Sequence, residues 1–273
     1  MSRAERAVGT PRGYVPQVLL VPAALGLALL VVPLLALVGR VEWPTLLADV
    51  TAPAALSALG LSMRTGLVAT ALCTLLGVPI ALLIARARAR TAALLRALVT
   101  VPLVLPPMVG GVALLLLFGR TGWLGPLLAD WGVRIPFSTP AVVLAQTFVA
   151  LPFLVLAVEG SLRATGVAYE QAAAALGASR WRILLRVTLP LAAPGLVAGV
   201  VLCFARAIGE FGATALFAGN APGVTQTMPL AIYTAFNGAG VSQGTAVALS
   251  LLLLATSIVV LLLVRAWRPG AAR

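Results

Sequence analysis

Arg206 and Glu210 stand four residues apart inside the apolar stretch "GLVAGVVLCFARAIGEFGATALF". Residues at this spacing share one face of a helix, so the two side chains can pair. Charges within a membrane span are costly and normally face a bundle interior or a water-filled cavity. An arginine there would attract an anion, and the glutamate would keep the anion from binding too tightly to leave. The pair therefore predicts either part of a transport pathway or a structural ion pair that fixes helix packing.

Other polar side chains that could line such a pathway are few. Gln146 lies within an apolar segment and could face the path or hydrogen-bond between helices. Thr214 lies four residues after Glu210, near the end of the same apolar stretch, and is a further candidate for the pathway or gate. Next comes "GNAPGVTQTMP", whose composition predicts an outward-facing loop or a broken helix. Four of its side chains could line a gate, meet a partner protein or only face solvent: Asn220, Thr225, Gln226 and Thr227.

The residue types exclude several kinds of chemistry. All nineteen basic residues are arginine, and histidine is absent. A phosphate-binding P-loop needs a lysine, so nucleotide hydrolysis by that route must come from another subunit. The seven acidic residues are scattered and form no paired carboxylates, so we expect no catalytic site, metal or cofactor. Cys73 and Cys203 both fall in apolar segments, where a free cysteine usually behaves as a small buried hydrophobe.

The elements that must position these residues are membrane spans. Of the 273 residues, 61% are hydrophobic and 10% are charged, which is far from the composition of a soluble domain. We predict an all-α polytopic membrane protein with one transmembrane domain over residues 17–264. The first span is too long for the apolar core of a signal peptide. Six apolar runs are long enough to cross a bilayer: 17–39, 62–85, 97–118, 140–159, 191–213 and 245–264.

The arginines set the orientation of these spans. Fourteen of the nineteen fall in four clusters on one side, which the positive-inside rule assigns to the cytoplasm. Both termini, segments 1–16 and 265–273, are then cytoplasmic. Because the clusters flank apolar runs, the net charge of +12 indicates membrane topology and not nucleic-acid binding. The stretch "VPLVLPPMVGG" at 101–111 predicts a kink or a broken helix.

A small-residue segment, "YEQAAAALGASRWRILLRVTLPLAAPG", follows the fourth predicted span on the cytoplasmic side. Its composition predicts a short helix over 169–176 that Gly177 ends in a left-handed conformation. A second amphipathic stretch, anchored by Trp181 and arginines, would lie at the membrane surface, with Pro190 in the first turn of span five. The four alanines keep the first helix slim enough to approach a partner closely, and Glu170 offers a charge for docking. An ordinary intracellular loop is the alternative.

The spacing of this segment resembles the cytoplasmic signature of binding-protein-dependent ABC importer permeases: E-A-A, three residues, G, nine residues, I-x-L-P. Gln171 and Val187 depart mildly from that pattern. The resemblance implies a type I importer fold, in which segment 169–190 is a coupling helix seated in a groove of a separate ATPase. The residues that it assigns to ATPase coupling are Tyr169, Glu170, Gln171, Ala172, Ala173, Gly177 and Arg180.

Two further stretches, "LVTVPLVLPPMVGGVALLLLFGRTGWLG" and "FARAIGEFGATALFAGNAPGVTQTMPLAIYTAFNGAG", resemble molybdate importer permeases, and the second also partly resembles sulfate permeases. The resemblance implies a bacterial inner-membrane homodimer with two ATPase copies and a periplasmic or lipid-anchored molybdate-binding protein. A sulfate, thiosulfate or tungstate permease and a heterodimer remain alternatives. A channel or secondary anion carrier that needs no ATP is the alternative from another class.

Overall fold

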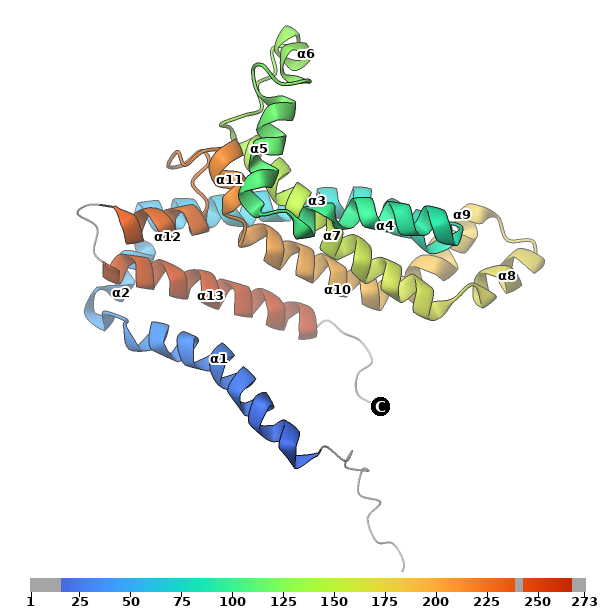
Figure 1. Ribbon diagram of the computed structural model, residues 1–273, viewed down its shortest axis with the longest axis horizontal. Helices are drawn as coiled ribbons and strands as arrows, with labels where there is room; N and C mark the ends of the chain where they lie inside the picture. Colours follow the sequence, from blue (N-terminus) through green and yellow to red (C-terminus); the bar gives the residue numbers. More distant parts are fainter. Residues whose placement is uncertain (1–15, 239–242, 267–273) are drawn as a thin grey trace, which may run out of the picture. The chain divides into compact units, whose positions relative to one another are not determined.

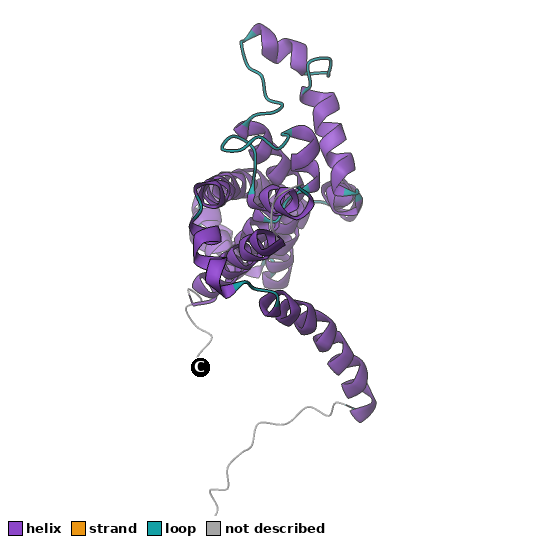
Figure 2. Cartoon of the chain, turned by 90° about the vertical axis from the view of Figure 1, so that its left-hand side faces the viewer, coloured by secondary structure: helices purple, strands orange, loops and turns teal. Residues whose placement is uncertain are grey.

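The computed structural model describes residues 16–238 and 243–266. The terminal segments 1–15 and 267–273, with the arginines predicted to mark a cytoplasmic side there, lie outside the described residues. All regular structure in the described ranges is helical, which confirms the all-α prediction (Figures 1 and 2). The elements are η1 (Gln17–Leu19), α1 (Leu20–Gly39), α2 (Trp43–Thr51), α3 (Pro53–Arg86), α4 (Ala89–Val104), α5 (Pro107–Phe118), α6 (Gly125–Asp130), α7 (Thr139–Thr165), α8 (Ala168–Ala175), α9 (Arg180–Ile183), η2 (Leu184–Thr188), α10 (Leu189–Ile208), α11 (Gly212–Phe217), α12 (Met228–Asn237) and α13 (Gln243–Ala266).

Five helical stretches of the described chain are long and apolar enough to cross a membrane: α1, α3, α7, the run from α9 to α10, and α13. The pair α4 and α5 would make a sixth, but it bends by 109°. The bend falls at Leu105 and Pro106, where the prolines indicated a break. Leu105 is extended, as a residue before proline prefers, and Pro106 and Pro107 cannot donate the hydrogen bonds that would continue α4.

The first span, α1, belongs to a separate compact unit that ends at Val41. None of its residues is buried, and its mean hydropathy is 2.6. A helix that is apolar all round is typical of a membrane span.

The second unit, from Glu42 onward, is built around α3, α7 and α10. Gly195 and Gly199, four residues apart on α10, lie against Ser161 and Ala157 of α7. A Cβ on Gly195 would collide with the Ser161 side chain, so the backbones approach closely. Packing through small residues at this spacing is the usual way in which helices associate in lipid. The same core buries Cys73 and Cys203 completely, and the Cys73 thiol donates to the Thr147 carbonyl oxygen of α7 at 3.5 Å.

Span five differs from its prediction at both ends. The basic stretch from Arg180 is continuous with α10, so the helical run of span five begins before residue 191. The continuity runs through the π-helical turn η2, and Pro190 occupies the first turn of α10, where its missing N–H costs no hydrogen bond. The helix ends at Ile208 and not near 213, because Gly209 and Glu210 break it before α11.

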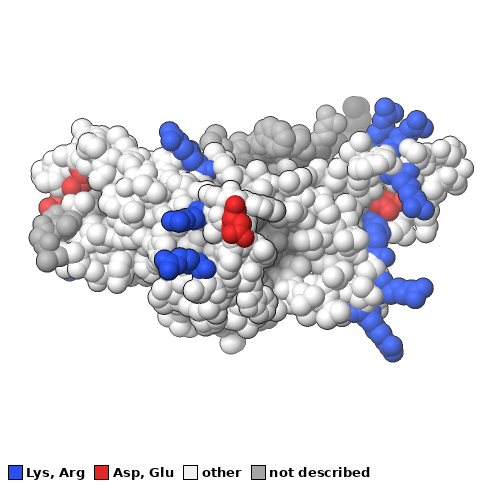
Figure 3. Space-filling view, turned by 90° about the horizontal axis from the view of Figure 1, so that it is seen from above, with Lys and Arg blue, Asp and Glu red and all other residues white. Residues whose placement is uncertain are grey.

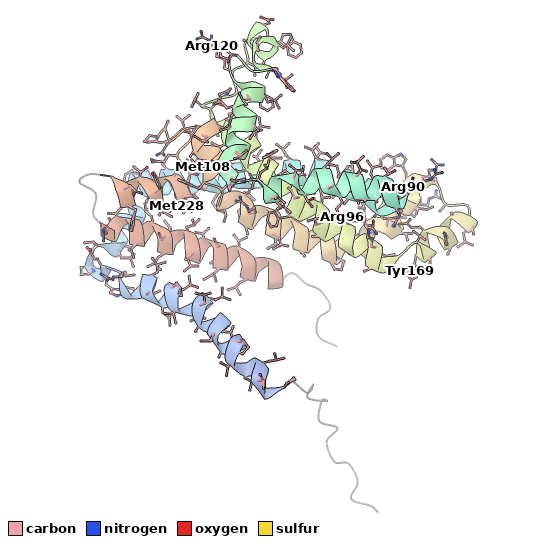
Figure 4. All side chains as sticks on the ribbon, in the orientation of Figure 1. Arg90, Arg96, Met108, Arg120, Tyr169 and Met228 are labelled. Carbon is pink, nitrogen blue, oxygen red and sulfur yellow. The ribbon has the colours of Figure 1, made fainter. Side chains whose placement is uncertain are left out.

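Basic side chains gather at the end of the second unit that carries α8 and α9, which we call the arginine-rich end (Figure 3). Here Glu159 of α7 is 3% exposed and lies between two arginines. It forms an ion pair with Arg96 of α4 (Figure 4) and accepts a 2.7 Å hydrogen bond from Nε of Arg163. This ion cluster joins α4 to α7 at the same end that holds the small-residue segment.

Candidate functional site

The predicted coupling segment forms the helix α8 followed by a tight turn. Gly177 has φ +80°, and its N–H donates to the Ala174 carbonyl oxygen at 3.0 Å. The Ala178 N–H donates to the Ala173 carbonyl oxygen at 3.1 Å. This pair of bonds is the Schellman arrangement, which satisfies the last carbonyls of a helix and needs a left-handed residue. The prediction that Gly177 ends the helix in a left-handed conformation is confirmed.

No residue of α8 is buried. Gln171 and Ala172 are exposed and Ala173 is partly exposed, so the slim alanine face is open to a partner. Large side chains nearby are also uncovered: Tyr169 is 64% exposed (Figure 4), Leu176 89% and Trp181 72%. Apolar exposure of this extent at one site is typical of a surface that another molecule covers.

Glu170, which the sequence predicted to offer a charge for docking, pairs with residues of its own chain. Its Oε1 accepts a 2.5 Å hydrogen bond from Nη2 of Arg86, the last residue of α3. The same oxygen accepts from the Thr188 hydroxyl at 2.9 Å, at the end of η2. We call these three residues the Glu170 cluster. Arg180 and Gln171 line the adjoining cavity of about 480 Å³.

The predicted pair of Arg206 and Glu210 is present. Nη2 of Arg206 lies 2.7 Å from Oε2 of Glu210, a close ion pair whose geometry falls short of a hydrogen bond. The other carboxylate oxygen accepts from the Ala213 N–H at 2.8 Å, in the first turn of α11. Glu210 is 1% exposed and the Arg206 side chain 26%. The pair therefore stabilises the break between α10 and α11, and the Arg206 side chain remains partly exposed.

An aromatic hollow adjoins this break. The rings of Phe211 and Tyr233 have centroids 5.1 Å apart at 46°. Together with Gly209, Phe236 and Asn237 they line an open cavity of about 440 Å³. Tyr233 and Phe236 remain more than half exposed. Sequence reasoning missed the hollow, because α12 follows the loop after α11 and nothing local shows that it folds back over Phe211.

The loop after α11 is more buried than predicted. Thr225 and Thr227 have no exposed surface. The Thr225 hydroxyl accepts from the Ala221 N–H, so it closes a turn, and exposed Asn220 donates to the Thr234 hydroxyl. Gln226 is partly buried.

Some buried polar atoms in this region have no partner among the described residues. Gln146 and Thr214 are wholly buried, and neither the amide of Gln146 nor the hydroxyl of Thr214 has a hydrogen-bond partner in the described part of the chain. The buried hydroxyl of Thr227 also has no hydrogen-bond partner there. Gln146 therefore does not show the interhelical hydrogen bond that the sequence left open. Buried polar groups of this kind usually bond to water or a ligand. The pathway roles of these residues stay predictions.

A family of transport proteins matches this chain. Residues 77–273 fit the family described as the binding-protein-dependent transport system inner membrane component. The chain belongs to this family. As a member of the inner membrane component family with several apolar helices, it is a multi-pass inner membrane protein.

Individual relatives match different lengths of this chain. The molybdenum transport system permease protein ModB of Mycobacterium tuberculosis is 50% identical over 95% of this chain and 97% of the relative. The sulfate transport system permease protein CysW of Synechococcus elongatus is 40% identical over 66% of this chain and 63% of the relative. Among solved structures, a bacterial ABC transporter involved in import of the acidic polysaccharide alginate has a TM-score of 0.70. It is 16% identical and covers 94% of this chain and 95% of its own, which supports the importer permease fold.

Arg86 and Thr188 are the site residues that sequence reasoning missed in this inner membrane component. Arg86 lies 84 positions from Glu170 and was assigned only to membrane topology. Thr188 stands at the x position of the I-x-L-P signature, to which the pattern gives no role. A lone acidic residue near several arginines suggests pairing, but the spacing along the chain does not say which arginine is the partner.

Proposed function

We propose that this chain is the membrane-spanning permease subunit of an ABC importer that moves molybdate across the inner membrane. The observation that carries the proposal is the 50% identity, over 95% of the chain, to a permease named for molybdenum transport. A separate ATPase subunit supplies the energy, since the chain lacks the lysine of a P-loop. An extracytoplasmic binding protein delivers the oxyanion. We expect no bound cofactor in the chain itself.

The arginine-rich end faces the cytoplasm in this proposal, and so do both termini. Support comes from the side chains gathered there in Figure 3 and from the positive-inside rule. The exposed helix α8 then points toward the ATPase and seats in a groove of that subunit. Its uncovered alanines and the neighbouring Tyr169 and Leu176 supply a slim, apolar contact surface.

Two copies of the chain form the importer, with two ATPase subunits below them. The pathway lies where the copies meet, beside the hollow of Gly209, Phe211 and Tyr233, whose aromatic surface is left exposed in one copy. ATP binding brings the two α8 helices together and opens the cavity outward to the binding protein. Hydrolysis resets it. Arg206 attracts the oxyanion, and its pairing with Glu210 keeps binding weak enough for release.

A sulfate permease is the second candidate, because the chain is also 40% identical to a sulfate permease over 66% of its length. The test is ATP-dependent uptake of labelled molybdate in proteoliposomes that hold the chain, its ATPase and its binding protein. We expect excess sulfate to leave uptake intact. We expect tungstate, a tetrahedral dianion of nearly equal size, to compete. Uptake abolished by sulfate would assign the chain to sulfate transport.

A further inference from the structure

One carboxylate links the exposed helix α8 to two membrane spans. The cavity of about 480 Å³ lies between α8, α9, η2 and the end of α3. Glu170 reaches across it to Arg86 at 2.5 Å and to Thr188 at 2.9 Å. Arg86 ends the 34-residue helix α3, and Thr188 directly precedes Leu189, where α10 begins. A displacement of α8 is therefore passed to both spans through the same oxygen atom.

We propose that Arg86 and Thr188 are positioning residues for energy coupling, which fix Glu170 so that α8 carries α3 and α10 with it when the ATPase moves it. The inference rests on the proposed function above. At the far end of α10 lies the pair of Arg206 and Glu210, at the break before α11. Motion passed along this helix thus arrives at the residues that would meet the oxyanion.

Close packing between α3 and α10 supports movement of the two spans as one body. A Cβ built on Gly66 of α3 would come within 2.7 Å of the Ile208 side chain of α10. Closely packed helices shift as units and do not deform continuously. The turn η2 also helps to position Thr188. A π-helical turn holds one more residue than an α-turn, so it determines the helix face on which Thr188 lies.

Holding the fold together is a minor role for this cluster. The side chains of Arg86 and Glu170 are 29% and 22% exposed, and partly solvated pairs contribute little to stability. Replacing Arg86 should therefore leave folding and ATPase assembly intact. Loss of the ATPase subunit from purified Arg86→Ala complexes would overturn the proposal, since Arg86 would then act in docking.

A double-mutant cycle tests the proposal. The readout is molybdate imported per ATP hydrolysed in proteoliposomes for Arg86→Ala, Glu170→Ala and the double variant. We expect Arg86→Ala to lower this ratio by about five- to tenfold, the size of an ordinary coupling between sites. The double variant should match Glu170→Ala, because Arg86 acts through Glu170. An unchanged ratio in Arg86→Ala, or losses that multiply in the double variant, would refute the inference.

Three further variants sharpen the cycle. Arg86→Lys should retain coupling, since the pair uses one nitrogen–oxygen contact that an ammonium can replace. Thr188→Val keeps the shape and removes the hydroxyl, and it should lower the ratio in the same direction. Arg90→Ala is the matched control, an exposed arginine on α4 with no ion pair in the described part of the chain (Figure 4). A loss in Arg90→Ala equal to that in Arg86→Ala would refute a specific role for Arg86.

Failure of the proposed function is separable from failure of this inference. If the wild-type complex imports no molybdate, the proposed function is wrong. The same cycle is then measured as stimulation of ATP hydrolysis by the binding protein. Nonadditive losses at Arg86 and Glu170 would still support the cluster, and independent losses would still refute it.

Discussion

Substitutions at Gly177 separate two reasons for a glycine in the coupling turn. The residue has φ +80°, and a Cβ built there meets nothing within 4 Å. A side chain at this position therefore collides with no other residue of the chain, and its energetic cost is that of the left-handed backbone conformation. A left-handed alanine costs about 1–2 kcal/mol, which is about a 5–30-fold loss of the native turn. Asparagine tolerates this region much better, and valine tolerates it worst. We therefore expect coupled uptake to fall in the order Gly, Asn, Ala, Val.

The order distinguishes this reasoning from its rival. If glycine is needed because the ATPase backbone approaches Gly177, side-chain size decides and asparagine must be worse than alanine. The assay is ATP-dependent molybdate uptake, with ATPase copurification measured in parallel. Gly160→Ala is the control, because that glycine lies in the helix α7 with no neighbour within 4 Å of an added Cβ and no positive φ. An Asn variant less active than the Ala variant would refute the conformational account.

Two further outcomes are expected. Glu210→Gln keeps the hydrogen bond from Ala213 but leaves Arg206 without its counter-charge, so uptake should show a lower KM and a lower kcat. A raised KM with unchanged kcat would contradict a role in limiting oxyanion affinity. Gly195→Val should destabilise the permease by about 1–3 kcal/mol through overpacking against α7, measured by thermal unfolding in detergent, whereas an unchanged midpoint would contradict the close approach.

Local sequence features predicted the elements that depend on neighbouring residues. The apolar runs predicted five helical stretches that are long and apolar enough to cross a membrane, and the alanines followed by Gly177 predicted α8 and its turn. The consecutive prolines at 106 and 107 indicated the break between α4 and α5. Each of these features follows from backbone preferences or from hydrophobic length, which depend only on residues that are close together in the sequence.

Contacts between distant residues could not be predicted in the same way. Glu170 is surrounded in sequence by several arginines, yet its partner is Arg86 on another span. The end of α10 at Ile208 depends on Glu210 accepting the Ala213 N–H, which stabilises a break where apolar composition alone predicts a continuous span. The burial of Thr225 and Thr227 depends on how the loop packs, since composition rich in Gly, Asn and Thr is typical of exposed and of buried turns.

Dependence of uptake on a working ATPase tests the central claim most directly. The measurement compares molybdate uptake by proteoliposomes that hold the chain and binding protein with active ATPase, with ATPase whose catalytic carboxylate is replaced by its amide, and with none. We predict uptake with the active ATPase alone. Equal uptake in all three preparations would show a channel or secondary carrier and would contradict the account of α8 as a coupling helix.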